Sequence, residues 1–179
     1  MLEQIGIEAK TAASEVAVLT ADKKNKILQS MADKLIENTS KILDANKVDL
    51  NNSKDLELTV ALTDRLTLNE ERIKSMANGL LKIIPLEDPV GNITSNWTTD
   101  EGLDIRKIRS PFGVIGVIYE ARPNVTSDVS GLCLKSGNAV ILRGSSYCLD
   151  SNIAILETLQ EALEAVSYTH LRAHETRNY

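Results

Sequence analysis

The sequence predicts an α/β protein in which helices and a β-hairpin precede the first part of a doubly wound parallel sheet. Three observations support this fold class. Apolar residues recur at helical spacing within residues 1–89, and two alternating segments follow within residues 90–109. Residues 110–165 then contain two almost wholly apolar runs, each followed by a helical pattern, as is typical of a parallel sheet with covered faces.

The first 89 residues divide into helical segments. Apolar residues recur at three- and four-residue steps over residues 5–19 and again over residues 27–45, so that each set lies on one face of a helix. The polar residues 51–54 end the second segment. We therefore expect one helix in each segment.

A further helix is predicted from Thr67, because Glu70 stands three residues later and completes the pattern of a capping box. Gly79 lies inside this helix and weakens it by about 1 kcal/mol relative to Ala. Pro85 ends the helix, since proline cannot continue it.

The next segment predicts a β-hairpin. Residues 92–98 and 103–108 show the alternation of strands, and Asp100-Glu101-Gly102 between them is a turn signal. The alternation breaks at Lys107 and Ile108. We therefore expect a bulge or an early strand end there.

Residues 110–165 predict a parallel unit with short connections, which is right-handed by rule. Its elements are a strand buried on both faces at residues 112–121, a helix at 126–136, a strand at 138–143 and a helix that Asp150 or Ser151 caps. Gly137 follows the first helix in the position that favours a left-handed residue. Two strands alone lack the neighbours that such a sheet needs, so we expect an architecture cut off within the sheet.

Composition excludes several classes of function. The chain has 179 residues and a formal net charge of −5 without a basic stripe, which argues against binding to nucleic acid or acidic membranes. No apolar stretch approaches the ~20 residues that span a bilayer, and no secretory signal is visible. Two cysteines do not make a disulfide framework. We expect a cytoplasmic protein.

The turn after the first predicted strand is a candidate site, because ligands of open parallel sheets bind outside the carboxyl ends of the strands. It reads Tyr119-Glu120-Ala121-Arg122-Pro123-Asn124. The amide of Asn124 could donate to an oxyanion that forms on an acyl carbon, and Arg122 could pair with a carboxylate or phosphate. The same spacing also occurs where such residues only close a turn, and that interpretation is the more frequent one.

The turn after the second predicted strand, Arg143-Gly144-Ser145-Ser146, is the other candidate. Arg143 could meet a ribose hydroxyl or a 2′-phosphate, Gly144 permits close backbone approach, and the serines add donors. An ordinary strand–helix loop would have the same residues. The chain contains neither G-x-G-x-x-G nor a Walker motif.

The cysteines and histidines offer weaker signals. Cys133 falls on a predicted helix and is expected to be buried and structural, whereas Cys148 falls in a loop where it could be exposed; we assign neither to catalysis. His170 and His174 have i, i+4 spacing, but no third ligand is evident. We expect no metal site.

Two segments, residues 110–126 and 132–144, closely resemble the gamma-glutamyl phosphate reductases, also called glutamate-5-semialdehyde dehydrogenases. Ser151-Asn152 and residues 88–91 support the resemblance, which covers about residues 1–165. It implies an aldehyde-dehydrogenase-like Rossmann domain and a step of proline biosynthesis. In that step NADPH reduces L-glutamyl 5-phosphate to glutamate 5-semialdehyde, with release of phosphate.

The resemblance also implies roles for individual residues. Asn124 would line the oxyanion site. Arg122, from its charge and its place in the turn, is the predicted substrate-binding residue. The predicted cofactor-binding residues are Tyr119, Glu120 and Ala121 on the nicotinamide side and Arg143, Gly144, Ser145 and Ser146 near the adenosine ribose. The hairpin at 90–109 would join copies into a homo-oligomer.

The family's cysteine nucleophile, which forms a thioester in a separate catalytic domain, has no counterpart in this sequence. Residues 166–179 resemble nothing in the family. We therefore expect a truncated or chimeric reading frame with a non-native tail, inactive on its own. Two alternatives stay open: a non-catalytic nucleotide-binding module, and a helical interaction protein built on residues 1–84.

Overall fold

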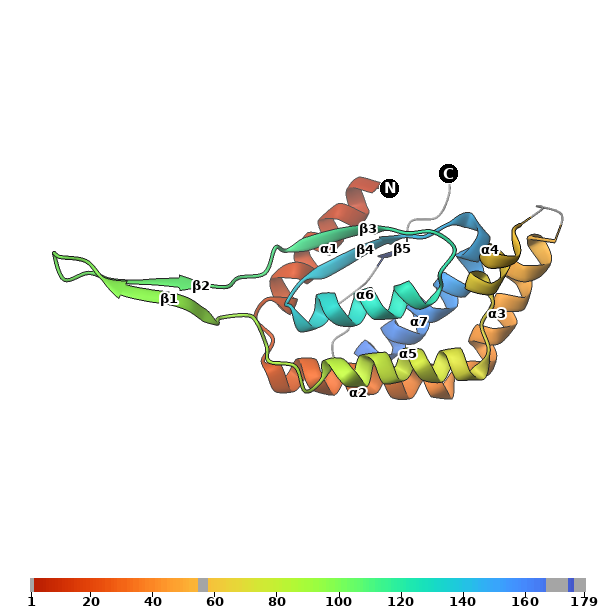
Figure 1. Cartoon of the computed structure of the whole chain (residues 1–179), viewed down its shortest axis with the longest axis horizontal. Helices are drawn as coiled ribbons and strands as arrows, with labels where there is room; N and C mark the ends of the chain where they lie inside the picture. The colour runs from red at the N-terminus through yellow and green to blue at the C-terminus, as the bar shows by residue number, and fades with distance from the viewer. Residues whose placement is uncertain (1, 55–57, 167–173, 176–179) are drawn as a thin grey trace.

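The computed structural model describes residues 2–54 and 58–166, together with the backbone of residues 174–175. Apart from Val166 and that backbone, the predicted tail therefore lies outside the described residues. The elements are α1 (Leu2–Val16), α2 (Ala21–Glu37), α3 (Thr39–Asn52), α4 (Val60–Leu66), α5 (Glu70–Ile83), β1 (Ile93–Thr98), β2 (Asp104–Ile108), β3 (Val114–Ile118), α6 (Asn124–Lys135), β4 (Ala139–Arg143), a 3₁₀ turn η1 (Ser146–Cys148), α7 (Leu149–Ala165) and β5 (His174–Glu175). Figure 1 shows a body of helices around a short sheet, from which β1 and β2 project.

The main core lies between helices. α2 packs against both α5 and α7, and α5 packs against α6. Ile27, Leu35, Ile73, Leu80 and Ile155 are fully buried in one cluster, which confirms the apolar faces expected from helical spacing. Among the described residues, no helix is long and apolar enough to cross a membrane.

The helix boundaries correct two predictions. The continuous helix expected over residues 27–45 is broken at Asn38, whose backbone is not helical and whose side-chain amide donates to the carbonyl of Lys34. The hydroxyl of Thr39 donates to the carbonyl of Ile36 at 2.8 Å. Such local bonds compete with the helical pattern, which explains the break.

The prediction of a capping box that starts at Thr67 is also wrong. Thr67 ends α4, a short helix that the sequence patterns did not reveal, and its hydroxyl donates to the carbonyl of Thr63 at 2.7 Å. The helix α5 begins after Asn69, whose side-chain oxygen accepts from the backbone nitrogen of Arg72 at 2.8 Å. Asn69 caps α5 because Asn is a strong N-cap residue, whereas the hydroxyl of Thr67 is already bonded to the carbonyl of Thr63.

The sheet contains the predicted parallel pair. Ile115 lies opposite Val140, and Val117 lies opposite Leu142, while the backbone of β5 pairs parallel with β4 on its other side. The helices α6 and α7 cover one face, and α1 lies against the other (Figure 1).

The expectation that the first strand is buried on both faces is wrong. β3 lies at the edge of the described sheet, its residues alternate between exposed and half-buried, and Ile118 is 86% exposed. The central strand β4 is the buried one. An apolar run of this kind does not show whether a strand is central or at an edge. A strand is central only when another strand lies on each side of it, and the run itself does not encode those neighbours.

The hairpin has the predicted strands and the predicted bulge. Ile93 pairs with Ile108 but Ser95 pairs with Lys107, so that Thr94 is the extra residue. Every residue of both strands is exposed, and the hairpin extends away from the body (Figure 1).

An ion pair fixes the start of the segment that leads to the hairpin. The ammonium group of Lys24, fully buried in α2, lies 2.8 Å from the carboxylate of Asp88. That carboxylate also accepts from the backbone nitrogen of Val90 at 3.0 Å. Removing either charged partner would leave the other without compensation in a buried place, which is strongly destabilising.

Gly137 ends α6 with a φ of +77°, as predicted. The prediction that Asp150 or Ser151 caps the last helix is wrong, because α7 begins at Leu149 and both residues lie in its first turn. Their backbone nitrogens donate to the carboxylate of Asp49 in α3 at 3.1 and 2.7 Å. A distant carboxylate therefore satisfies the orphan donors at this helix N-terminus.

Candidate functional site

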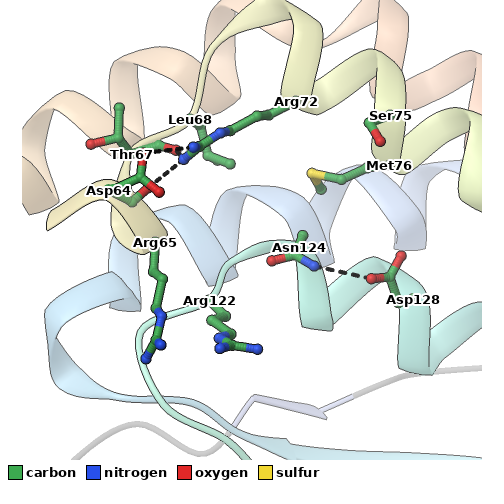
Figure 2. A pocket seen from close by; sticks show the side chains of 10 residues that line it. All are labelled: Asp64, Arg65, Thr67, Leu68, Arg72, Ser75, Met76, Arg122, Asn124 and Asp128. Carbon is green, nitrogen blue, oxygen red and sulfur yellow. Dashed lines mark hydrogen bonds and ion pairs between the residues drawn. The ribbon is translucent and has the colours of Figure 1, made fainter. Parts of the chain in front are cut away.

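The carboxyl ends of β3 and β4 lie side by side, and the turn after β3 separates two cavities. We call the first the strand-end cavity; it measures about 430 Å³ and lies over the ends of both strands. The second, the helix cavity, measures about 360 Å³ and lies between α4, α5 and the start of α6 (Figure 2). Both sizes fall in the range of small-molecule sites.

The structure brings six of the seven predicted cofactor-binding residues to the strand-end cavity. They are Tyr119, Glu120, Ala121, Arg143, Gly144 and Ser145. Ser146 is exposed at the start of η1 and does not line it. Ile118, Leu62 of α4 and Tyr147 also line it. The sequence patterns pointed to neither Leu62 nor Tyr147, because their positions depend on how distant segments pack.

A hydrogen-bonded chain holds the two turns together beneath the strand-end cavity. The hydroxyl groups of Tyr119 and Thr126 lie 2.7 Å apart, and the Thr126 hydroxyl donates to the side-chain oxygen of Asn152 at 3.2 Å. The amide of Asn152 in turn lies 3.4 Å from the sulfur of Cys148. Thr126 and Asn152 are fully buried. The end of β3, α6 and α7 are therefore fixed relative to one another.

Gly144 is required by this packing. A Cβ atom at position 144 would lie 2.1 Å from the side-chain nitrogen of Asn152 and 3.2 Å from the ring of Tyr119. The sequence predicted that Gly144 permits close approach; in the structure the approaching groups are these two side chains. The guanidinium of Arg143 donates to the Gly144 carbonyl at 2.7 Å.

Neither cysteine has the setting of a nucleophile. Cys133 is buried, as predicted, and its burial raises the pKa of the thiol to about 11. Cys148 is also fully buried, which corrects the expectation of an exposed loop position; its sulfur lies 3.4 Å from the carbonyl of Ser145. A reactive thiol needs access and a lowered pKa.

The two other predicted site residues line the helix cavity. Asn124 begins α6, and Arg122 precedes it in the turn (Figure 2). The side-chain nitrogen of Asn124 donates to the carboxylate of Asp128 at 3.1 Å. An amide nitrogen carries two hydrogens, so one remains to donate to another group.

Burial shapes the charge of Asp128. The carboxyl is half-buried, and desolvation raises its pKa, while the hydrogen bond from Asn124 acts in the opposite direction. Asp128 was not singled out by any sequence pattern. Its spacing of four residues from Asn124 on one helix is the signal that could have found it.

Arginines surround the helix cavity, but they differ in their partners. Arg72 pairs with the carboxylate of Asp64 at 2.8 Å and donates to the carbonyl groups of Asp64 and Thr67. Arg65 and Arg122 are exposed and make no ion pair or side-chain hydrogen bond within the described part of the chain. Sequence reasoning missed Arg65 because it lies on α4, which was itself not predicted.

No group of three or more His, Cys, Asp or Glu residues lies close enough to hold a metal ion in residues 2–54 and 58–166. Of the histidine pair considered above, His170 lies outside the described residues, and nothing is described of the side chain of His174. The polar groups that the structure places around the two cavities include the guanidiniums of Arg143, Arg65 and Arg122 and the amide of Asn124.

Solved structures identify the fold. A propionaldehyde dehydrogenase from Clostridium phytofermentans overlays on 99% of this chain with a TM-score of 0.63 at 16% identity, and the overlay covers 37% of that protein. No protein-family model matches the chain. The arrangement of helices, hairpin and parallel strands is thus that of part of an aldehyde-dehydrogenase-like fold.

Proteins with higher sequence identity to this chain point to one family within this fold class. The gamma-glutamyl phosphate reductase of Thermotoga maritima overlays on 99% of this chain and 43% of its own, with a TM-score of 0.94 at 37% identity. Curated proteins of that name from Thermodesulfovibrio yellowstonii and Caldanaerobacter subterraneus are 50% and 53% identical over 88% and 87% of this chain. The chain is thus homologous to part of the gamma-glutamyl phosphate reductases and spans 38% and 37% of the length of these two relatives.

Proposed function

We propose that this chain supplies part of a cytoplasmic enzyme of proline biosynthesis, in which NADPH reduces L-glutamyl 5-phosphate to L-glutamate 5-semialdehyde and phosphate. Residues 1–165 would form a partial NADP-binding domain, and residues 166–179 would lie outside it. The observation that carries the proposal is the joint lining of the strand-end cavity by both predicted turns, with Asn124 in the adjacent helix cavity.

The strand-end cavity suits a dinucleotide. Arg143 brings a guanidinium to a wall that is otherwise largely apolar or aromatic, with Leu62, Tyr119 and Tyr147 among its residues. A guanidinium matches the geometry of a phosphate, and we assign Arg143 to the ribose and its 2′-phosphate. Gly144 and Ser145, which also line the cavity, would lie beside the ribose, and Tyr119, Glu120 and Ala121 would border the nicotinamide.

Bound NADPH would supply the hydride, while the chain's own residues position the acyl group. The amide hydrogen of Asn124 that is not bonded to Asp128 would donate to the oxygen of the acyl carbon as negative charge develops there. The hydrogen bond to Asp128 would orient the Asn124 amide so that its second N–H can donate to the substrate. Arg122 would contact an anionic group of the substrate. The nucleophilic cysteine would come from a part of the enzyme that this sequence does not contain, because Cys133 and Cys148 are both buried.

Titration of NADPH into the 179-residue chain, followed by nicotinamide fluorescence, tests the cofactor site. Arg143→Ala should weaken binding by about tenfold or more, since a charge-assisted bond contributes about 1.5–3 kcal/mol. Arg106→Ala, an exposed arginine on β2, is the matched control and should bind as the unaltered chain does. Equal affinities of the two variants, or no saturable binding, would refute the assignment.

The same chain should not turn over L-glutamyl 5-phosphate with NADPH, because it lacks an accessible cysteine. Product formation by the purified chain would contradict this part of the proposal.

A further inference from the structure

Arg65 has no role in the function proposed so far, yet it shares the helix cavity with Arg122. The two arginines come from different elements: Arg65 lies near the end of α4, and Arg122 lies in the turn before α6. Figure 2 shows both side chains at the same end of the cavity, with Asn124 and Asp128 of α6 to their right. Segments more than fifty residues apart in the sequence thus present cations to one space.

The position of Arg65 is fixed by its neighbour. Leu66 is fully buried, and its carbonyl accepts from the side-chain amide of Asn46 at 2.9 Å. The oxygen of the same amide accepts from the backbone nitrogen of Leu68 at 2.8 Å. Asn46 is itself buried, so the end of α4 is attached to α3 at both Leu66 and Leu68. Arg65 is therefore an exposed side chain on a firmly held backbone.

The cavity carries excess positive charge although the chain is acidic. Three arginines and two aspartates line it, whereas the whole chain has a net charge of −5. Asp64 is engaged by Arg72, and Asp128 faces the amide of Asn124. Arg65 and Arg122 have no acidic partner among the described residues. Two unpaired guanidinium groups beside one cavity indicate an anionic ligand.

The position of Asn124 indicates which anionic group is bound. If Asn124 donates to the acyl oxygen, the phosphoryl group lies close by, because only the bridging oxygen separates it from the acyl carbon. The α-carboxylate of a glutamyl group lies three carbons further away. Arg122 is two residues from Asn124, so the doubly charged phosphoryl group is the nearer partner.

We propose that Arg65 and Arg122 together bind the phosphoryl group of the acyl phosphate, an inference that rests on the proposed function. A pair of guanidiniums suits a dianion, because each can offer two parallel N–H donors. Arg65 thereby becomes a residue that selects an acyl phosphate over the corresponding free acid.

A stable analogue tests this inference: the ketophosphonate in which a methylene group replaces the bridging oxygen of L-glutamyl 5-phosphate. In calorimetric titrations of the 179-residue chain, Arg65→Gln and Arg122→Gln should each weaken binding by about tenfold or more. Arg106→Gln on β2 is the control and should leave the affinity unchanged. Inorganic phosphate should compete with the analogue, and L-glutamate should not.

Three results would overturn the inference. These are unaltered affinity in Arg65→Gln, competition by L-glutamate as strong as by phosphate, and failure of the unaltered chain to bind the analogue. Arg65→Lys keeps the charge without the planar donor pair, so its affinity for the analogue should lie between those of the unaltered chain and Arg65→Gln. NADPH titration of the same samples separates the two proposals: Arg65→Gln should keep its NADPH affinity, and loss of NADPH binding by the unaltered chain would refute only the cofactor assignment.

Discussion

Asn124 and Asp128 lie one turn apart at the start of α6, and their hydrogen bond sets the direction of the Asn124 amide. Space for this pair comes from α5. A Cβ atom at Gly79 would lie 3.3 Å from a carboxylate oxygen of Asp128, a tight contact. The glycine that weakens the propensity of α5 therefore allows α6 to bring its carboxylate close.

Asn124→Ala should raise the pKa of Asp128 further above its ordinary value. Burial already raises that pKa, and the amide donor stabilises the charged form, so that removing the donor leaves desolvation unopposed. A carboxyl ¹³C NMR titration measures the change. Asn92→Ala, at the base of the hairpin, should leave the Asp128 pKa where it is; an unchanged or lower pKa in Asn124→Ala would contradict the described geometry.

Gly144→Ala should destabilise the chain by about 1–3 kcal/mol, the range for overpacking a filled site. The added methyl group would meet the side chain of Asn152, which is buried and bonded on both sides. Gly6→Ala in α1 is the control, because nothing lies within 4 Å of its added atom; it should leave the free energy of unfolding unchanged or raise it. Urea denaturation measures both, and equal effects would disprove the packing argument.

At the scale of single residues, the sequence predicted the site residues that directly follow strands. It did not reveal the residues that reach the cavities from other elements. Arg122, Asn124 and Arg143 could be found because the end of a parallel strand is a binding position whatever packs around it. Arg65 could not be found, since its place depends on how α4 attaches to Asn46 of another helix. The burial of Cys148 likewise follows from contacts that no local pattern encodes.

Among the elements, α7 depends most clearly on a distant residue. Its first turn has no local side-chain cap, and Asp49 of α3 accepts from the backbone nitrogen and hydroxyl of Ser151 and from the backbone nitrogen of Asp150. The hydroxyl also receives a bond from the amide of Asn46. This buried network joins α3 to the helix that follows the Arg143 turn.

Asp49→Ala should therefore lower the free energy of unfolding by about 1–3 kcal/mol, the cost of leaving buried donors unsatisfied. The exposed Asp44 on the same helix pairs with Lys47 at the surface, so Asp44→Ala should cost less than about 1 kcal/mol. Chemical denaturation measures both. Similar losses in the two variants would show that Asp49 does not act as the cap of α7.

The predictability of the elements follows their locality. The hairpin, its bulge and the order of strands and helices after it were predicted, since alternation and turn residues are local signals. The break at Asn38, the short helix α4 and the start of α5 at Asn69 were not. In each of these places side-chain bonds to the backbone decide between continuing and ending a helix.

The molecule as a whole leaves apolar surface uncovered in two places. Phe112 precedes β3 and Ile118 ends it, and they are 93% and 86% exposed. Trp97 and Ile105 face each other across the projecting hairpin. Exposed apolar patches of this kind indicate contact with other protein surface. We propose that the hairpin joins copies of the complete protein into a homo-oligomer.

Sedimentation equilibrium of the chain tests this proposal. Lysine at both Trp97 and Ile105 should shift the chain toward monomer, because their paired side chains form one apolar face of the hairpin. Asn96→Lys places one lysine at a neighbouring position of opposite orientation and should leave association unchanged. Association that persists in the double variant would place the contact elsewhere, with Phe112 and Ile118 as the remaining surface.

The reductase assignment itself is tested by activity. Residues 1–165 can replace the segment of the Thermotoga maritima reductase on which they overlay, and the chimera can be assayed for NADPH formation from glutamate 5-semialdehyde, NADP⁺ and phosphate. We expect phosphate-dependent turnover, with Asn124→Ala lowering kcat by roughly 10²–10³-fold, as for the loss of an oxyanion donor. A folded, NADPH-binding chimera without turnover, or one that keeps its full kcat in Asn124→Ala, would contradict the proposed function.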